Sequence, residues 1–240
     1  DQVDAILMND RPIAEPLDDP VVCDTHVGLI PIRLGRGDTP CRLTTDPTPC
    51  ESICGVALGA DLKAAWGISH GQGLYLMQHL GDASHPAVIS RIEDSMQKLL
   101  RSDLPAKLIF TDMHPAYETA LLGKRLAESN FDRSPGIGFQ AIQHHAAHLG
   151  ALAVDAQIGF EDLLVGYVFD GTGYGTDGTI WGGELIGLRG SEFSRLGHLR
   201  PFRLPGGDVA AKNPWRTALA LFVDAGLDIR NLQGCGDWTR

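Results

Sequence analysis

The sequence has few cysteines, few aromatic residues and no long apolar run, and these shortages exclude several classes of protein. Five cysteines among 240 residues are too few for a scaffold held together by disulfides. No stretch approaches the roughly 18 apolar residues that cross a bilayer, and no basic and then apolar segment opens the chain as a secretory signal. The 43% of hydrophobic residues excludes intrinsic disorder. We therefore expect a globular cytoplasmic protein without a membrane partner.

Basic residues are also scarce. The chain has 20 Lys and Arg against 30 Asp and Glu, which gives a formal net charge of −10. Proteins that bind nucleic acid grip its phosphates with clustered Lys and Arg, and the longest basic run here is the pair Lys124 and Arg125. The charge therefore excludes nucleic acid as the main partner.

The first fifty residues differ in composition from the rest. Seven prolines lie between residues 12 and 49, a spacing that disfavours long helices. We interpret residues 1–49 as the end of one domain plus a linker, and residues 50–240 as part of a second domain. Because the chain opens with Asp1 and has no obvious terminal element at its other end, we expect a segment of a longer protein.

Beyond residue 54, short apolar runs alternate with stretches of helical periodicity, which predicts an α/β fold with a mixed sheet and flanking helices. We predict strands at 55–59, 64–68, 74–77, 107–110, 137–142 and 163–169, and a hairpin from 179–188 and 193–202. Helices are predicted from Pro86 to about residue 100 and at 116–128, 143–156 and 215–224.

A group of histidines lies on one predicted helix, in the sequence QHHAAH at 143–148. His144 and His148 are four residues apart, so both imidazoles lie on one helix face and can converge on a metal ion. His145 points about 100° away, which favours a supporting or structural role. Such pairs also occur by chance on solvated faces, and taken alone the spacing favours that alternative.

A glycine-rich segment follows the strand at 163–169, and Asp170 stands at the end of that strand. The glycines, which have no Cβ to keep a phosphate away from the backbone, are Gly171, Gly173, Gly175 and Gly178. Tyr174 and Asp177 belong to the same segment. The alternative is a tight hairpin turn, which needs one or two glycines rather than four, so we predict a loop that contacts nucleotide phosphate.

Two further bends are weaker candidates for contact with a nucleotide. Lys63 follows a Gly-flanked turn and could contact a phosphate as a point charge, although an ordinary exposed lysine fits equally well. Gly206 and Gly207 form another bend, for which a simple loop is favoured unless it faces the same cleft.

Two other groups favour structural roles. Cys50 and Cys54 have a spacing that could begin a zinc site, but no further ligands complete it, so we interpret all five cysteines as reduced thiols. The segment DMHP at 112–115 is typical of a functional loop at a strand end, and a buried His114 that caps the next helix is the slightly favoured alternative.

Several motifs occur together and in order: QHHAAH at 143–148, FDGTGYGTDGTIWGGE at 169–184, LPGGD at 204–208 and PWR at 214–216. GADLK at 59–63, YLMQHLGD at 75–82 and DMHPAY at 112–117 fit the same pattern. With these motifs the chain resembles the HypF family of nickel–iron hydrogenase maturation carbamoyltransferases, over nearly its whole length.

The resemblance implies the first half of an ASKHA (actin/hexokinase-like ATPase) fold, the N-terminal part of a Kae-type carbamoyltransferase domain, preceded by the tail of a YrdC-type domain. In that family, carbamoyl phosphate and ATP yield carbamoyl-adenylate. The carbamoyl group passes to the C-terminal cysteine of the partner HypE and becomes the cyanide ligand of the hydrogenase iron. The related enzyme that places threonylcarbamoyl on tRNA shares the fold.

The resemblance also implies roles for single residues. His144, His148 and Asp170 would be ligands of a divalent metal, and residues 171–178 would lie against the adenylate phosphate, with Mg²⁺ accompanying the nucleotide. Two histidines and one carboxylate suit Zn²⁺ or Fe²⁺, which would act as a Lewis acid on the carbamoyl oxygen.

Some features depart from the family pattern. Residues 32–37 keep two of three usual arginines, Arg33 and Arg36, and Pro20 stands where serine is usual. The acylphosphatase-like domain, the zinc fingers, most of the YrdC-type domain and the second ASKHA half, with a fourth ligand Asp, are absent from these residues. We do not expect the segment alone to complete the reaction. Alternatives are an O-carbamoyltransferase for a small-molecule hydroxyl, or a noncatalytic remnant that binds nucleotide and metal and docks a partner.

Overall fold

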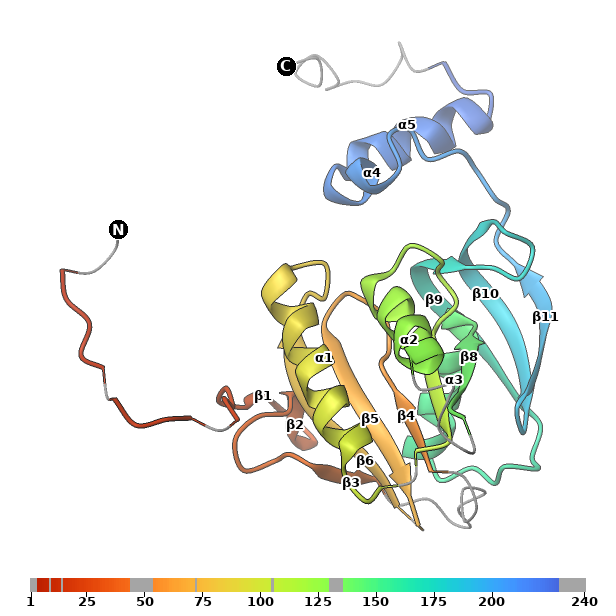
Figure 1. Cartoon of the computed structure of the whole chain (residues 1–240). Coiled ribbons are helices and arrows are strands. Elements are labelled where there is room, and N and C mark those ends of the chain that lie inside the picture. The colour runs from red at the N-terminus through yellow and green to blue at the C-terminus, as the bar shows by residue number, and fades with distance from the viewer. Residues whose placement is uncertain are drawn as a thin grey trace. The chain divides into compact units, whose positions relative to one another are not determined.

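The computed structural model describes residues 4–8, 10–13, 15–43, 54–71, 73–104, 106–129 and 136–228, without the side chains of Asp208 and Ala211. The chain divides into two compact units, Asp1–Leu196 and Gly197–Arg240 (Figure 1). Among the helices within the described ranges, none combines the length and the apolar composition that crossing a bilayer requires. The predicted domain boundary at residues 49–50, together with Cys50 and Cys235, lies outside these ranges.

A six-stranded mixed sheet forms the centre of the first unit, with the order β3-β6-β5-β4-β7-β8. Its strands are β3 (Cys41–Leu43), β4 (Gly55–Ala57), β5 (Ala64–His70), β6 (Gly73–Gly81), β7 (Leu108–Asp112) and β8 (Gly138–Ile142). The strands predicted at 55–59, 64–68 and 74–77 are confirmed as β4, β5 and β6, which pair antiparallel in sequence order and form a meander. β7 runs parallel to both β4 and β8, which makes the sheet mixed as predicted. A separate hairpin joins β1 (Val21–Thr25) and β2 (Gly28–Arg33).

Two helices lie side by side over this sheet, α1 (Pro86–Arg101) and α2 (Glu118–Ser129) (Figure 1). Both were expected from the 3.6-residue spacing of their apolar side chains. In α1 the buried residues Ile92, Met96 and Leu100 recur every four positions and form one face. They pack into a core that includes Leu58 and Leu122, both fully buried.

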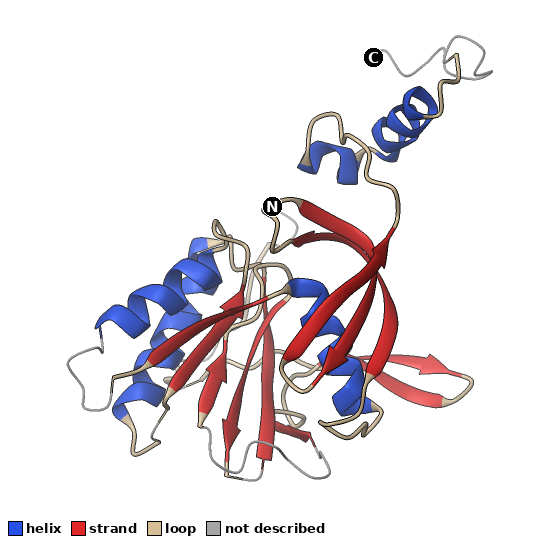
Figure 2. Ribbon diagram, turned by 90° about the vertical axis from the view of Figure 1, so that its right-hand side faces the viewer, coloured by secondary structure: helices blue, strands red, loops and turns tan. Residues whose placement is uncertain are grey.

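A second sheet follows the helix α3 (His144–Asp155). It has three strands in the order β11-β10-β9: β9 (Leu164–Tyr174), β10 (Ile180–Arg189) and β11 (Glu192–His198). Figure 2 shows α3 between the two sheets. A second core, made of Leu149, Val168, Trp181 and Ile186, joins α3 to the three-stranded sheet. The predicted hairpin after residue 179 is thus confirmed, although its second strand ends at His198 rather than at residue 202.

The second unit contains two helices, α4 (Asp208–Lys212) and α5 (Pro214–Asp224). α5 begins at Pro214, one residue before the predicted start, and the short α4 was not predicted. Gly206 and Gly207 make the turn before α4 with positive φ angles of 90° and 54°, which explains why glycines stand there. An ion pair joins Arg200, near the start of this unit, to Asp224, the last residue of α5.

Candidate metal centre

The candidate site begins at the edge of the six-stranded sheet where the parallel strands β4, β7 and β8 end. The backbone N–H of Asp112 donates to the carbonyl of Gly59 at 3.2 Å, and Met113 donates to Ile142 at 2.9 Å. These bonds bring together the turn after β4, the loop after β7 and the start of α3. The carboxyl ends of parallel strands are where α/β folds place their ligands.

The local sequence places the histidines at this edge. Gln143 is the N-cap of α3, and its side-chain Oε1 accepts a hydrogen bond from the backbone N–H of Ala146 at 2.9 Å. Because β8 ends only one residue earlier, the first turn of α3 stands directly over the sheet edge. His144 and His148 share one helix face, as predicted, with ring centroids 4.9 Å apart.

Asp170 reaches the same point through a bulge in β9. Phe169 pairs with Gly183, and the next pair is Gly173 with Trp181, so residues 170–172 stand opposite Gly182 alone. A bulge changes which residues face the core. Here Asp170 contacts α3 on one side of the bulge, and Gly173, which the alternation of the strand would leave exposed, is buried on the other.

His144 lies between two carboxylates from different sheets. Its Nδ1 is 2.6 Å from Oδ2 of Asp112, at the end of β7, and its Nε2 is 2.8 Å from Oδ2 of Asp170 in β9. Nε2 of His148 is 3.8 Å from the same Asp170 oxygen. The hydrogen bond with Asp112 is the main cause that raises the pKa of His144 above its ordinary value, although burial opposes this shift.

These residues fit a divalent metal. The ligand atoms of His144, His148 and Asp170 all lie within 4.8 Å of one another, so a small shift brings them around one ion. Two imidazole nitrogens with one carboxylate oxygen form a set that binds Zn²⁺ or Fe²⁺ and leaves further positions open. Asp112 accepts from Nδ1 and leaves Nε2 for the ion, which is the usual support of a metal-bound histidine.

The predicted phosphate loop is wrong as a description of the backbone. β9 continues through Gly171 and Gly173 to Tyr174, and a tight turn to β10 is closed by Gly175 N–H donating to Thr179 O at 2.8 Å. The backbone of this segment is therefore a strand and a tight turn, and its contact with phosphate stays a prediction. The pairing of β9 with β10 is interrupted at the bulge and resumes at Gly173. The alternation of residues in the sequence does not reveal this.

Packing within the chain explains two of the four glycines. A Cβ on Gly173 would lie 2.5 Å from the His145 ring, and one on Gly175 would lie 2.0 Å from Nε1 of Trp181. A Cβ on Gly171 would meet no atom within 4 Å, and one on Gly178 would only approach the Tyr174 hydroxyl at 3.8 Å. Gly171 therefore remains open to a ligand and Gly178 is required by its φ of 76°, whereas Gly173 and Gly175 make room for side chains of α3 and β10.

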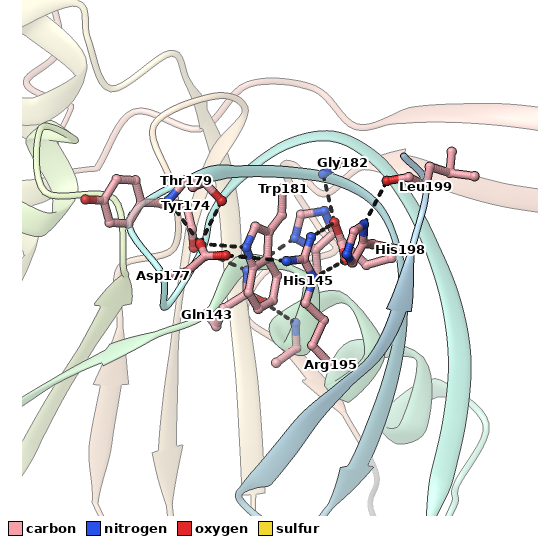
Figure 3. Close-up of polar contacts among 12 residues, drawn as sticks. Gln143, His145, Tyr174, Asp177, Thr179, Trp181, Gly182, Arg195, His198 and Leu199 are labelled. Atoms are coloured by element: carbon pink, nitrogen blue, oxygen red, sulfur yellow. Dashed lines mark hydrogen bonds and ion pairs between the residues drawn. The ribbon is translucent and has the colours of Figure 1, made fainter. Parts of the chain in front are cut away.

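Asp177 serves the hairpin itself (Figure 3). Its Oδ1 accepts from Thr179 N–H at 3.0 Å, from the Thr179 hydroxyl at 2.7 Å and from Trp181 Nε1 at 2.9 Å. These bonds, led by those from Thr179, lower the pKa of Asp177 to about 2. Tyr174 lies edge-on to the ring of His114, with centroids 5.4 Å apart. Contact of Asp177 or Tyr174 with a nucleotide stays a prediction.

The weaker candidates for contact with a nucleotide, Lys63 and the bend at Gly206 and Gly207, lie in different units. Lys63 is exposed, with φ of 53°, in the predicted turn between β4 and β5, and this turn lies at the same sheet edge as His144. Gly206 and Gly207 belong to the second unit, so their place beside a nucleotide stays a prediction.

The sequence did not predict the roles of two buried carboxylates, Asp61 and Asp112, and it assigned the helix-capping role to His114 instead. His114 is half-buried rather than buried, and its ring accepts from the backbone N–H of Ala116 at 3.3 Å. α2 is capped instead by Asp61, which accepts from the first backbone N–H groups of that helix at 2.9 and 3.0 Å. Asp112 supports His144. An Asp as the last residue of a buried strand was the available signal for Asp112, and its distance of 32 residues from His144 concealed the contact.

Two family models match the chain. "HypF Kae1-like domain" matches residues 51–155, and "Carbamoyltransferase, Kae1-like Domain, second subdomain" matches residues 166–237. The chain belongs to the HypF family. The carbamoyltransferase HypF of Synechocystis sp. is 35% identical over 237 residues, which are 98% of this chain and 29% of that protein. The carbamoyltransferase HypF homolog of Cupriavidus necator is 38% identical over 180 residues, which are 75% of this chain and 44% of that protein.

Solved structures of HypF proteins share the fold. Full-length HypF in its phosphate- and nucleotide-bound form matches with a TM-score of 0.78 and 26% identity, over 92% of this chain and 33% of that chain. T. kodakarensis HypF matches with a TM-score of 0.73 and 30% identity, over 87% of this chain and 26% of that chain. The chain thus spans about a third or less of these HypF structures. The expected Kae1-like fold with a mixed sheet is confirmed, and the tail of a YrdC-type domain stays a prediction.

Proposed function

We propose that this chain carries the carbamoyl-transfer site of a HypF-type enzyme. In this proposal, carbamoyl-adenylate made from carbamoyl phosphate and ATP transfers its carbamoyl group to the C-terminal cysteine of a HypE-type protein. The convergence of His144, His148 and Asp170, with Asp112 behind His144, is the observation that supports it most. A bound Zn²⁺ or Fe²⁺ would supply Lewis-acid polarisation of the carbamoyl group, and Mg²⁺ would accompany the nucleotide.

The chain's own residues hold and orient the reactants. Asp112 fixes the ring of His144 so that Nε2 points toward Asp170. His148 is more than half exposed, and a pocket of about 340 Å³ beside it and Asp170 leaves room for a substrate. Gly171 leaves the backbone next to Asp170 open to a phosphate, and Lys63 stands at the same sheet edge.

The reaction needs no nucleophile from this chain. The acceptor thiolate attacks the carbamoyl carbon, a carbon–sulfur bond forms, the bond to the adenylate oxygen breaks, and AMP leaves with the electron pair. The polar groups around the acyl carbon therefore need only to position it and to stabilise developing negative charge.

Metal content and carbamoyl transfer test the proposal together. In the complete protein we expect His144→Ala and His148→Ala to lose bound Zn²⁺ or Fe²⁺, measured by elemental mass spectrometry, and to lose transfer of labelled carbamoyl to a peptide with the HypE terminus. His70→Ala, which removes an exposed histidine at the end of β5, should keep both. Unchanged metal content and transfer in the first two variants would refute the site.

The acceptor is tested separately. The proposal expects transfer to the terminal cysteine of the peptide and none when that cysteine is replaced by serine. Transfer to small-molecule hydroxyls, with the thiol peptide inert, would instead identify an O-carbamoyltransferase. Calorimetry that finds HypE binding but no affinity for ATP in the complete protein would identify a docking remnant.

A further inference from the structure

Arg195, in β11, connects three charged or aromatic residues beside the site (Figure 3). Its Nε and Nη2 donate to both carboxylate oxygens of Glu184, at 2.7 and 2.9 Å. Its Nη1 approaches Asp177 at 3.4 Å, and the guanidinium lies 4.2 Å from the centre of the Trp181 ring. Glu184 is only 2% exposed, and a buried carboxylate is costly unless a partner of this kind neutralises it.

One line of contacts runs from Arg195 through Trp181 to α3. Trp181 is buried, and its ring centroid is 6.2 Å from that of His145. His145 is fully buried and fills the space that the missing side chain of Gly173 leaves. Nε2 of Gln143, the α3 N-cap, lies 3.2 Å from Nδ1 of His145 and donates to the carbonyl of Tyr174 at 3.3 Å. These contacts hold the first turn of α3, which carries the first histidine of the candidate centre, against β9.

A second line of contacts runs from Arg195 to the bulge in β9. Oε1 of Glu184 accepts from Nη2 of Arg195 and also from the backbone N–H of Gly182 at 3.2 Å. Gly182 stands opposite the bulged residues 170–172. The Glu184 carboxylate therefore fixes the strand against which the bulge, and with it Asp170, is set.

We propose that Arg195 is a positioning residue of the candidate metal centre, acting on His144 through Trp181 and on Asp170 through Glu184. The inference rests on the proposed function, because it concerns the geometry of that centre. Arg195 touches none of the three candidate ligands. The core between α3 and its sheet is built by apolar side chains such as Leu149 and Ile186, so the guanidinium is not needed to bury that core.

Cobalt binding in the complete protein tests this role, because the absorption spectrum of Co²⁺ reports the geometry of its ligands. Circular dichroism and thermal unfolding first establish that each variant is folded. We expect Arg195→Met to weaken Co²⁺ binding roughly 10- to 100-fold, as loss of a residue that supports metal ligands commonly does, and to alter the spectrum. Arg195→Lys keeps the positive charge but not the two-pronged contact, and should have a smaller effect.

The matched control is Arg125→Met, which removes a guanidinium from the 3.5 Å ion pair with Glu93 on the α1 and α2 side. It should leave the affinity and the spectrum unchanged. If Arg195→Met is not folded, Arg195→Lys decides, because it leaves the buried Glu184 neutralised. Wild-type spectrum and affinity in the folded Arg195 variants would overturn the positioning role alone. Failure of the unmodified protein to bind Co²⁺ would overturn the proposed metal centre and this role together.

Discussion

At the scale of single residues, His144 is defined by the carboxylate on each of its ring nitrogens. Asp112 is almost fully buried, whereas Asp170 is one-third exposed. A carboxylate that is buried and hydrogen-bonded holds the imidazole in one orientation, and the exposed one can move to share a metal ion. The two aspartates should therefore have different effects when each is replaced.

We expect Asp112→Asn to weaken Zn²⁺ binding roughly 10- to 100-fold without removing a ligand, because a neutral amide orients and polarises the imidazole less well. Asp170→Asn should abolish binding, since it removes a ligand. Isothermal calorimetry on both variants measures this difference. Asp94→Asn, on an exposed position of α1, is the control that should bind as the unmodified protein does. Equal affinities of Asp112→Asn and the unmodified protein would contradict the role of Asp112.

Metal binding should also depend on pH. The pKa of His144 is raised above 6.5, chiefly by Asp112, so a proton occupies the ring at higher pH than in a free histidine. The metal must displace this proton, and Zn²⁺ affinity should therefore rise with pH through the range above 6.5. Asp112→Asn removes the main cause of the shift and should move this rise to lower pH. A pH series of calorimetric titrations with both proteins measures the shift, and identical pH profiles would count against the assignment.

At the scale of elements, periodicity was sufficient for most of the fold and insufficient for the site. α1 was predictable because its apolar residues form one face, and the strands β4, β5 and β6 were predictable because short apolar runs alternate with glycines. The bulge in β9 was not predictable, because simple alternation assigns every second residue to one face. It does not allow for three residues, 170–172, that stand opposite one residue of the next strand. Pairing with β10 resumes beyond the bulge at Gly173, and the turn closed by Gly175 and Thr179 follows, so the glycines form a strand and turn rather than the predicted loop.

The glycines of this hairpin should respond differently to alanine. Gly173→Ala would push against the buried His145 ring and should cost about 1–3 kcal/mol of unfolding free energy, as overpacking does. It should also weaken metal binding, because the ring stands next to His144. Gly171→Ala meets no atom and should leave the folding free energy and the metal affinity unchanged.

Denaturant unfolding and nucleotide titration of the two variants separate these effects. If a phosphate lies against the backbone at Gly171, as proposed, Gly171→Ala should lower the affinity for ATP while unfolding as the unmodified protein does. Equal unfolding free energies of Gly173→Ala and the unmodified protein would show that His145 can move away at no cost.

At the scale of the whole molecule, the motifs indicated the family but not how distant segments meet. The family was recognisable because several short motifs occur in one order, which does not require knowledge of their contacts. The contact of Asp112 with His144 depends on β7 and β8 being neighbours, and the contact with Asp170 depends on a second sheet. Such pairings are set by packing over the whole unit, which local spacing does not encode.

Net charge makes a prediction at this scale. The fold is Kae1-like, and an enzyme that modifies tRNA is expected to share it, but a formal charge of −10 opposes binding to a phosphate backbone. We expect fluorescence anisotropy with labelled tRNA to show no binding at physiological salt. Lowering the salt concentration should also not produce the steep gain in affinity for tRNA that a basic protein shows. A specific, salt-dependent complex would contradict the choice of a protein acceptor.

The position of His144 has a mechanical consequence. Its ring connects β7 of one sheet to β9 of the other, so an ion that tightens Asp170 onto the histidines also fastens the two sheets to each other. Chelation should then loosen both layers at once. Amide hydrogen exchange would speed up together in β7, β9 and the first turn of α3, although these segments are far apart in the sequence, while the far strands β3 and β6 keep their protection.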